Sequence, residues 1–242
     1  RHSHTHRLLP MFTIARCAVC VITVMLALAI GGCTTGSFHV KNLAKSDMNY
    51  VADTAMQDVE FWLRELTIKL YKRNPREIKK GVEQDPSVKV GQIFAYPGRR
   101  LIFAELNRAE EVDAMLLGLD PDFEGDRVFA VMVGLTGMLR RSYGYQHEYF
   151  LFDSLDAQAL YNSARNIEVL VWRLKQRKGS DGKPLLLTNS GPGEPINLSY
   201  ERLFGRLIGI QDLMARMAED RSNRTITKVV QSAASAVFLP IP

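Results

Sequence analysis

VFAVMVGLTGML, residues 128–139, is the most apolar run of the chain after residue 33. Arg127 precedes the run, and Arg140 and Arg141 follow it. As a helix, the run would span ~18 Å at ~1.5 Å per residue, whereas the hydrocarbon core of a membrane is ~30 Å thick. A helix that is apolar on every side is typical of the centre of a globular domain. We therefore predict a buried core helix, with contact to a membrane as the alternative.

The segments around this run carry apolar residues at every third or fourth position, which is the pattern of an amphipathic helix. Gly134 and Gly137 would let neighbouring helices approach the central run closely. The sequence therefore predicts an all-α fold in a single domain, with about six or seven helices. The helices are expected at residues 46–72, 74–81, 107–119, 126–142, 153–178, 199–221 and 224–238.

Residues 86–104 support two interpretations. Asp85 followed by Pro86 is typical of a helix start, because aspartate caps the first turn and proline suits its first position. Val88 and Val90 alternate with polar residues, however, and the later Pro97-Gly98 could form the turn of a short hairpin. Helical or irregular structure is favoured because no other segment offers a partner strand, and the hairpin stays open as the alternative.

The N-terminal part of the chain has the layout of a secretory signal. A short basic segment, Met11–Arg16, is followed by an apolar segment that ends in Ile30-Gly31-Gly32-Cys33. These four residues resemble the lipobox of bacterial lipoproteins. The resemblance implies cleavage between Gly32 and Cys33 and attachment of lipid, such as palmitate, to Cys33. Thr34 is not the aspartate that retains such proteins in the inner membrane, which implies an outer-membrane protein that faces the periplasm.

This resemblance divides the chain into four parts. We expect an upstream extension at 1–10, a signal peptide at 11–32, a tether at 33–45 and a helical periplasmic domain at 46–242. A permanent transmembrane anchor is the alternative for the apolar segment. That alternative is disfavoured because the segment is short for a spanning helix and no basic cluster follows Cys33.

The charge and the cysteines exclude several classes of function. The net charge is +5, and the expected cleavage removes three arginines and no acidic residue, leaving about +2. A nearly balanced chain predicts no nucleic-acid partner, since nucleic-acid binding calls for a clustered basic face. Cys17 and Cys20 form a C-x-x-C motif inside the signal peptide, and the histidines of residues 1–10 also precede the cleavage site. Neither group is expected to bind metal or act in redox chemistry.

The best metal candidate in the remaining chain is an acidic loop. Asp120, Asp122 and Glu124 lie at alternate positions before Gly125, as at the start of an EF-hand loop. The twelfth position is Val131 rather than the required bidentate glutamate. We therefore expect no metal site here, and we interpret the loop as a helix–helix connection whose acids favour the next helix start.

A dense aromatic segment follows the central run. Tyr143, Tyr145, His147 and Tyr149 alternate with smaller or polar residues, which would place them on one face of an extended segment. Such a face could bind a ligand or a protein partner, because tyrosine offers both an aromatic surface and a hydroxyl group. The alternative is a loop that closes the core.

Catalytic motifs are sparse. His147, with Glu148 and Asp153, could form an acid–base set, but no nucleophile motif accompanies them. No zinc-protease motif and no glycine-rich phosphate loop are present, so no cofactor is expected. The sequence favours a non-catalytic binding or scaffolding role, with the protein anchored to the membrane by the lipid on Cys33 and with an envelope protein as a candidate partner. A hydrolase of peptidoglycan or glycan, and a carrier of lipid or small apolar ligands, are the alternatives.

Overall fold

The computed structural model describes residues 47–150, 154–190, 193–222, 225–228 and 237–242. The chain separates into two units, Arg1–Ala44 and Lys45–Pro242, and every described residue belongs to the second. The lipobox, Cys33 and the predicted tether therefore lie outside the described residues. No helix within these ranges combines the length and apolar character needed to cross a membrane.

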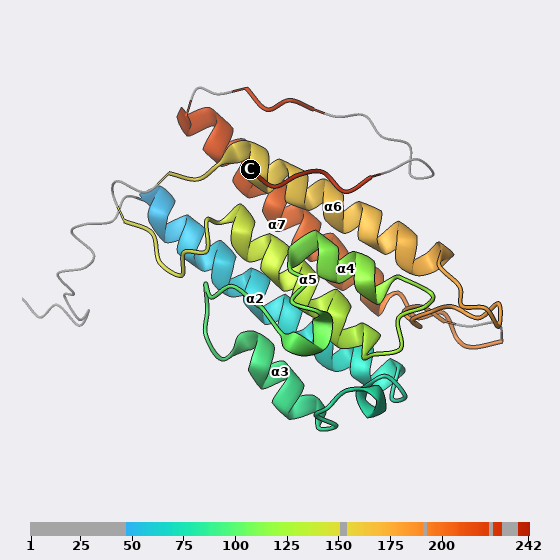
Figure 1. The fold of residues 1–242 in the computed structure, drawn as a ribbon. Helices are drawn as coiled ribbons and strands as arrows, with labels where there is room; N and C mark the ends of the chain where they lie inside the picture. The colour runs from blue at the N-terminus through green and yellow to red at the C-terminus, as the bar shows by residue number, and fades with distance from the viewer. Residues whose placement is uncertain (1–46, 151–153, 191–192, 223–224, 229–236) are drawn as a thin grey trace, which may run out of the picture. The chain divides into compact units, whose positions relative to one another are not determined.

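The described unit is all-α, as predicted, and contains six α-helices (Figure 1). No strand is present among its described residues. Two short 3₁₀ helices, Ile78–Lys80 and Ala104–Leu106, lie between the longer elements. The α-helices are α2 (Asp47–Arg73), α3 (Pro86–Phe94), α4 (Glu111–Gly118), α5 (Arg127–Ser142), α6 (Ala157–Gln176) and α7 (Ser199–Ser222).

Helix α5 is the centre of the fold, which confirms the prediction of a buried core helix. It contacts α2, α3, α4 and α6, and α7 packs against α2 and α6. Of its sixteen residues, only Arg141 is exposed. The apolar stripes of the surrounding helices cover α5 on its different sides, so its uniform apolar character follows from its position.

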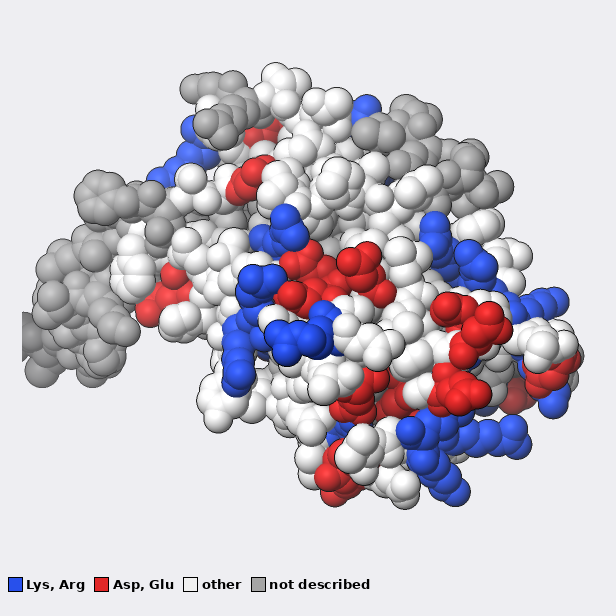
Figure 2. Space-filling view, in the orientation of Figure 1, with Lys and Arg blue, Asp and Glu red and all other residues white. Residues whose placement is uncertain are grey.

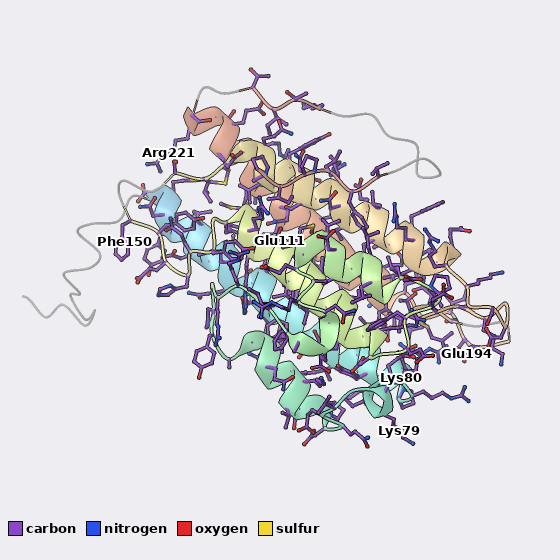
Figure 3. The ribbon with its side chains drawn as sticks, viewed as in Figure 1. Lys79, Lys80, Glu111, Phe150, Glu194 and Arg221 are labelled. Atoms are coloured by element: carbon purple, nitrogen blue, oxygen red, sulfur yellow. The ribbon has the colours of Figure 1, made fainter. Side chains whose placement is uncertain are left out.

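Close contact between α4 and α5 depends on one of the two glycines in the central run. A Cβ atom at Gly134 would lie 2.5 Å from the backbone nitrogen of Met115, whereas at Gly137 the nearest atom would be 3.6 Å away. Helix α4 also meets the far end of α5 through Glu111, which accepts hydrogen bonds from Arg141 (3.0 Å) and from the Tyr145 hydroxyl group (Figure 3).

The segment 237–242 packs against α6. The Asn166 side chain donates to the carbonyl oxygen of Leu239 (2.8 Å) and accepts from its backbone nitrogen (2.6 Å). Asn162 donates to the carbonyl oxygen of Pro240 (2.8 Å), and Ile241 is buried. The helix predicted at 224–238 is therefore wrong at 225–228 and 237–238, which are irregular, and its other residues lie outside the described ranges.

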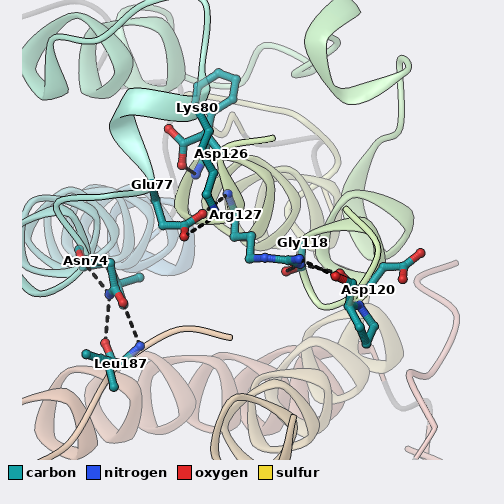
Figure 4. Close-up of polar contacts among 11 residues, drawn as sticks. Asn74, Glu77, Lys80, Gly118, Asp120, Asp126, Arg127 and Leu187 are labelled. Atoms are coloured by element: carbon teal, nitrogen blue, oxygen red, sulfur yellow. Dashed lines mark hydrogen bonds and ion pairs between the residues drawn. The ribbon is translucent and has the colours of Figure 1, made fainter. Parts of the chain in front are cut away.

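The structure decides between the two interpretations of residues 86–104 and changes the prediction for residues 74–81. The hairpin alternative for residues 86–104 is wrong, because α3 begins at Pro86 with Asp85 accepting from the Ser87 backbone nitrogen (2.8 Å). The short helix predicted at 74–81 is present only as the 3₁₀ helix Ile78–Lys80, and its predicted start at Asn74 is wrong. Asn74 does not cap a new helix; its side chain donates to Leu187 O (2.9 Å) and accepts from Leu187 N (2.7 Å), which ties the end of α2 to the loop before α7 (Figure 4).

Candidate functional site

A mostly apolar pocket of about 260 Å³ opens where α2, the end of α3 and the end of α5 meet. Its apolar wall includes Leu63 of α2, Phe94 of α3, and Leu139 and Tyr143 at the end of α5. Apolar pockets of this kind, with a few polar groups at defined positions, are the usual form of small-molecule sites.

Three charged residues line the same pocket: Glu60, Arg64 and Arg140. Arg140 is only 5% exposed. Its Nε donates to the Glu60 carboxylate (2.6 Å) and one terminal nitrogen donates to the carbonyl oxygen of Arg99 (3.1 Å). The other terminal nitrogen is buried and has no hydrogen-bond partner in the described part of the chain. An unsatisfied charged donor is costly, so this guanidinium has capacity for a further acceptor.

Arg64 provides a second guanidinium at the rim, because its side chain lies in an exposed position of α2. Its carbon atom Cζ lies 5.0 Å from the centre of the Phe94 ring, and one nitrogen lies 3.4 Å from the Phe94 carbonyl oxygen. With exposed His147 also lining the pocket, two permanent cations and one imidazole face a single carboxylate, that of Glu60. The arrangement favours an apolar ligand that carries a negative group.

The turn after α5 is held in place by buried polar contacts. Gly144 and Tyr145 have positive φ angles of 66° and 58°, which fold the chain back over the end of α5. Gly98 also has a positive φ, 73°, and a Cβ atom there would lie 2.6 Å from the Tyr145 carbonyl oxygen. The Tyr143 hydroxyl group donates to Gln211 Oε1 (2.8 Å), and burial raises the pKa of that hydroxyl well above its usual range.

This geometry replaces the extended aromatic face that the alternation predicted, and that extended conformation is wrong. Tyr143 and Tyr149 are buried, and the Tyr149 hydroxyl group donates to the carbonyl oxygen of Tyr143. Tyr145 is half-buried, and only His147 is exposed. Of the four residues, Tyr143 and His147 line the pocket. Tyr149 instead lines a smaller pocket of about 160 Å³ with Met48 and Ala52 of α2.

The hydrolase alternative depends on three residues that the structure describes unevenly. His147 lies at the rim of the pocket, but Asp153 is outside the described residues. The geometry of His147, Glu148 and Asp153 as a set therefore stays a prediction.

The acidic loop before α5 is organised by an arginine of the chain itself. The Arg127 guanidinium donates to the carbonyl oxygens of Gly118 (3.1 Å), Asp120 and Pro121 (2.9 Å) (Figure 4). These carbonyl groups are thus already bound to a cation. Within the described ranges, no three His, Cys, Asp or Glu side chains gather closely enough to hold a metal ion. This applies to the weak candidate set Asp120, Asp122 and Glu124.

A buried charged cluster at the N-terminal end of α5 was not predicted from the sequence. The Lys89 side chain is fully buried, and its Nζ lies 2.5 and 2.7 Å from the two Glu105 carboxylate oxygens and 3.9 Å from the centre of the Phe129 ring. Asp126 accepts from the Phe129 backbone nitrogen (2.9 Å) and from the Tyr71 hydroxyl group (2.8 Å). Burial raises the pKa of Asp126 above its usual range. One pattern could have revealed this cluster: Lys89 lies four residues before buried Ile93, on the same helical face.

The pocket residues Glu60, Arg64 and Arg140 were also missed. In the sequence, Arg140 marked only the end of an apolar run, and its pairing with Glu60 joins positions 80 residues apart. Comparison with protein-family models, curated proteins and solved structures finds no match to this chain.

Proposed function

We propose that this chain is a non-catalytic binding protein of the bacterial envelope, anchored at the outer membrane by the lipid on Cys33. Its ligand is a small amphipathic anion that occupies the pocket between α2, α3 and α5. The observation that carries the proposal is the charge of the pocket: an apolar wall with two guanidinium groups and one carboxylate. The apolar part of the ligand would pack against Leu63, Phe94 and Leu139, and its acidic group would lie near the arginines.

The test compares ligands that differ only in their head group. Octanoate, octanol and octylammonium are titrated calorimetrically into the full chain in nanodiscs, with empty nanodiscs as the reference. We expect octanoate to bind most tightly, and Arg64→Glu to weaken octanoate binding about tenfold or more. Arg216→Glu, an exposed position of α7 outside the pocket, is the matched control. Equal binding of the three head groups, or no binding of any, would overturn the proposal.

The anchor is tested separately. Cys33→Ser removes the thiol that the lipobox resemblance assigns to lipidation. We expect the variant to lose both processing and membrane fractionation as a lipoprotein. A variant that is processed and sorted as before would contradict the anchor without affecting the pocket.

A further inference from the structure

A second hollow, of about 380 Å³, lies between α2 and the N-terminal part of α7. Four cationic side chains line it: Lys69 and Lys72 from α2, and Arg202 and Arg206 from α7. Residues three or four positions apart share a face of a helix, so each helix presents its two cations to the same groove. We call this site the α2–α7 groove.

The four cations lack acidic partners. None of them forms an ion pair within the part of the chain that the structure describes, and the groove contains one carboxylate, that of Glu65. Cations just outside it are paired, as Arg73 is with Glu194 and Lys175 is with Glu201 (2.7 Å). The face in Figure 2 likewise shows acidic and basic side chains side by side. A groove that collects four unpaired cations is therefore a local exception.

Several contacts hold these cations in position. The Arg206 guanidinium lies 4.0 Å from the centre of the Trp62 ring, and Lys69 Nζ lies 5.6 Å from that of Tyr200. Such cation–π contacts fix a charged group without neutralising it. The Tyr200 hydroxyl group donates to the carbonyl oxygen of Lys69 (2.8 Å), which joins the start of α7 to α2.

The start of α7 adds to the positive field. Ser199, its first residue, lines the groove, and the Ser199 Oγ is buried and has no hydrogen-bond partner among the described residues. The N-terminus of a 24-residue helix carries a partial positive charge, and its Ser199 N–H donates to the Asn197 side chain (3.0 Å). The unpaired hydroxyl group and the unpaired cations thus point to the same kind of ligand.

We propose that the α2–α7 groove binds phosphate groups, two at a time, as in a diphosphate or a phosphate-bearing head group. A guanidinium matches a phosphate with two parallel hydrogen bonds, and a lysine ammonium adds a compact point charge. Two cations on each side of the groove supply both kinds of contact to each phosphate. This site is separate from the apolar pocket and does not depend on the function proposed for it.

The first experiment measures binding of inorganic pyrophosphate, inorganic phosphate and hexaglutamate to the full chain in phosphatidylcholine nanodiscs, by calorimetry. We expect pyrophosphate to bind more tightly than either of the others. The double variant Lys72→Gln with Arg202→Gln, both at exposed positions, should weaken pyrophosphate binding about tenfold or more. Arg216→Gln changes an exposed arginine of α7 outside the groove and should leave the affinity for pyrophosphate within about twofold of the wild-type value.

A second arm distinguishes a free phosphate compound from a lipid head group. Phosphatidylglycerol in the nanodisc should compete with pyrophosphate if the head group reaches the groove, whereas oleate at equal charge should compete less. Competition by phosphatidylglycerol identifies a lipid head group as the source, and its absence, with pyrophosphate bound, identifies a free phosphate compound. Equal competition by oleate would overturn the preference for phosphate. The proposal is overturned if pyrophosphate does not bind, if the double variant binds it unchanged, or if hexaglutamate binds equally well.

Discussion

The two ends of α5 both bring charged side chains into the core, but they differ in how completely these charges are satisfied. At the N-terminal end, both terminal nitrogens of Arg127 donate to loop carbonyls, Asp126 accepts two hydrogen bonds, and Lys89 is paired with Glu105. At the C-terminal end, Arg140 keeps one buried nitrogen without a partner in the described chain, beside an open pocket.

This difference separates a structural role from a binding role. The closed cluster joins α3, the loop before α4 and the start of α5, and its charged groups pair with one another or with backbone groups. The open end has the same kind of charge and a cavity next to it. Buried charge alone therefore does not mark a site, and the binding role that we propose rests on the incomplete set of partners beside the cavity.

Removal of the buried lysine from the closed cluster tests this comparison most strongly. Lys89→Met should lower the free energy of unfolding by about 3 kcal/mol, because Glu105 then lacks its buried partner. The estimate takes the low end of the usual range since the Glu105 side chain is 21% exposed. Chemical denaturation measures the change. Lys183→Met, which breaks the exposed ion pair with Asp181 (3.7 Å), should cost less than ~1 kcal/mol. Equal losses would show that the Lys89 cluster is not structural.

The middle of α5 gives the next largest expected effect. Gly134→Ala should cost about 2 kcal/mol, because the new Cβ atom meets the backbone of α4, which cannot move independently. Gly137→Ala is the matched control and should stabilise the chain by up to ~1 kcal/mol through helix propensity, since its Cβ atom meets nothing closer than 3.6 Å. Thermal unfolding of the two variants separates the steric cost at Gly134 from the gain in helix propensity. An unchanged stability of Gly134→Ala would contradict the close contact between α4 and α5.

Arg140→Met should cost only about 1 kcal/mol, clearly less than Lys89→Met. The variant removes a buried donor that has no partner together with the ion pair, and loss of that unsatisfied donor offsets much of the cost of leaving Glu60 unpaired. The same variant should reduce the preference of the pocket for octanoate over octanol. A loss of stability as large as that of Lys89→Met, with unchanged ligand preference, would assign Arg140 a structural role instead.

The smallest expected effect is a pH dependence at the closed end. Burial raises the pKa of Asp126 in the folded chain, so the folded state holds this proton more tightly than the unfolded state does. The contribution of Asp126 to stability should therefore fall as pH rises from the ordinary aspartate range, ~4, through the raised pKa. Asp126→Asn keeps a good helix cap and does not titrate. As pH rises, the free energy of unfolding of the wild type should fall relative to that of Asp126→Asn. A difference between the two proteins that does not change with pH would contradict the raised pKa of Asp126.

The sequence predicted those elements whose periodic pattern is set locally. The apolar stripes of α2, α6 and α7 and the uniform run of α5 each predict a helix without knowledge of the partners. For α3 the pattern was ambiguous because Lys89 interrupts its buried face, and the ion pair with Glu105 that permits this burial forms only in the folded chain. The segment 74–81 is too short to show such a stripe. The stripe at 224–238 predicts a helix, but in the structure Ile226 N donates to Glu219 (2.7 Å) and Thr227 N to the Gln158 side chain (2.8 Å), and 225–228 is irregular.

The candidate site was predictable only in part, for a related reason. Tyr143 and His147 attracted notice as members of an aromatic segment. Arg64 and Glu60 did not, because a charged residue on an amphipathic helix is ordinary until the fold places it beside a cavity. The four cations of the α2–α7 groove are likewise unremarkable in sequence, since two come from each of two helices 130 residues apart along the chain.

The contact between Asn166 and residue 239 also bears on when folding can finish. Synthesis adds residue 239 long after α6, at a sequence separation of 73 residues. Until then the fully buried Asn166 amide has neither its carbonyl acceptor nor its N–H donor, at a cost of about 1–3 kcal/mol for each unsatisfied group. A shortened chain that ends before residue 237 should therefore unfold more readily than the full one. The order of synthesis thus delays completion of the helical core until the segment 237–242 has been made.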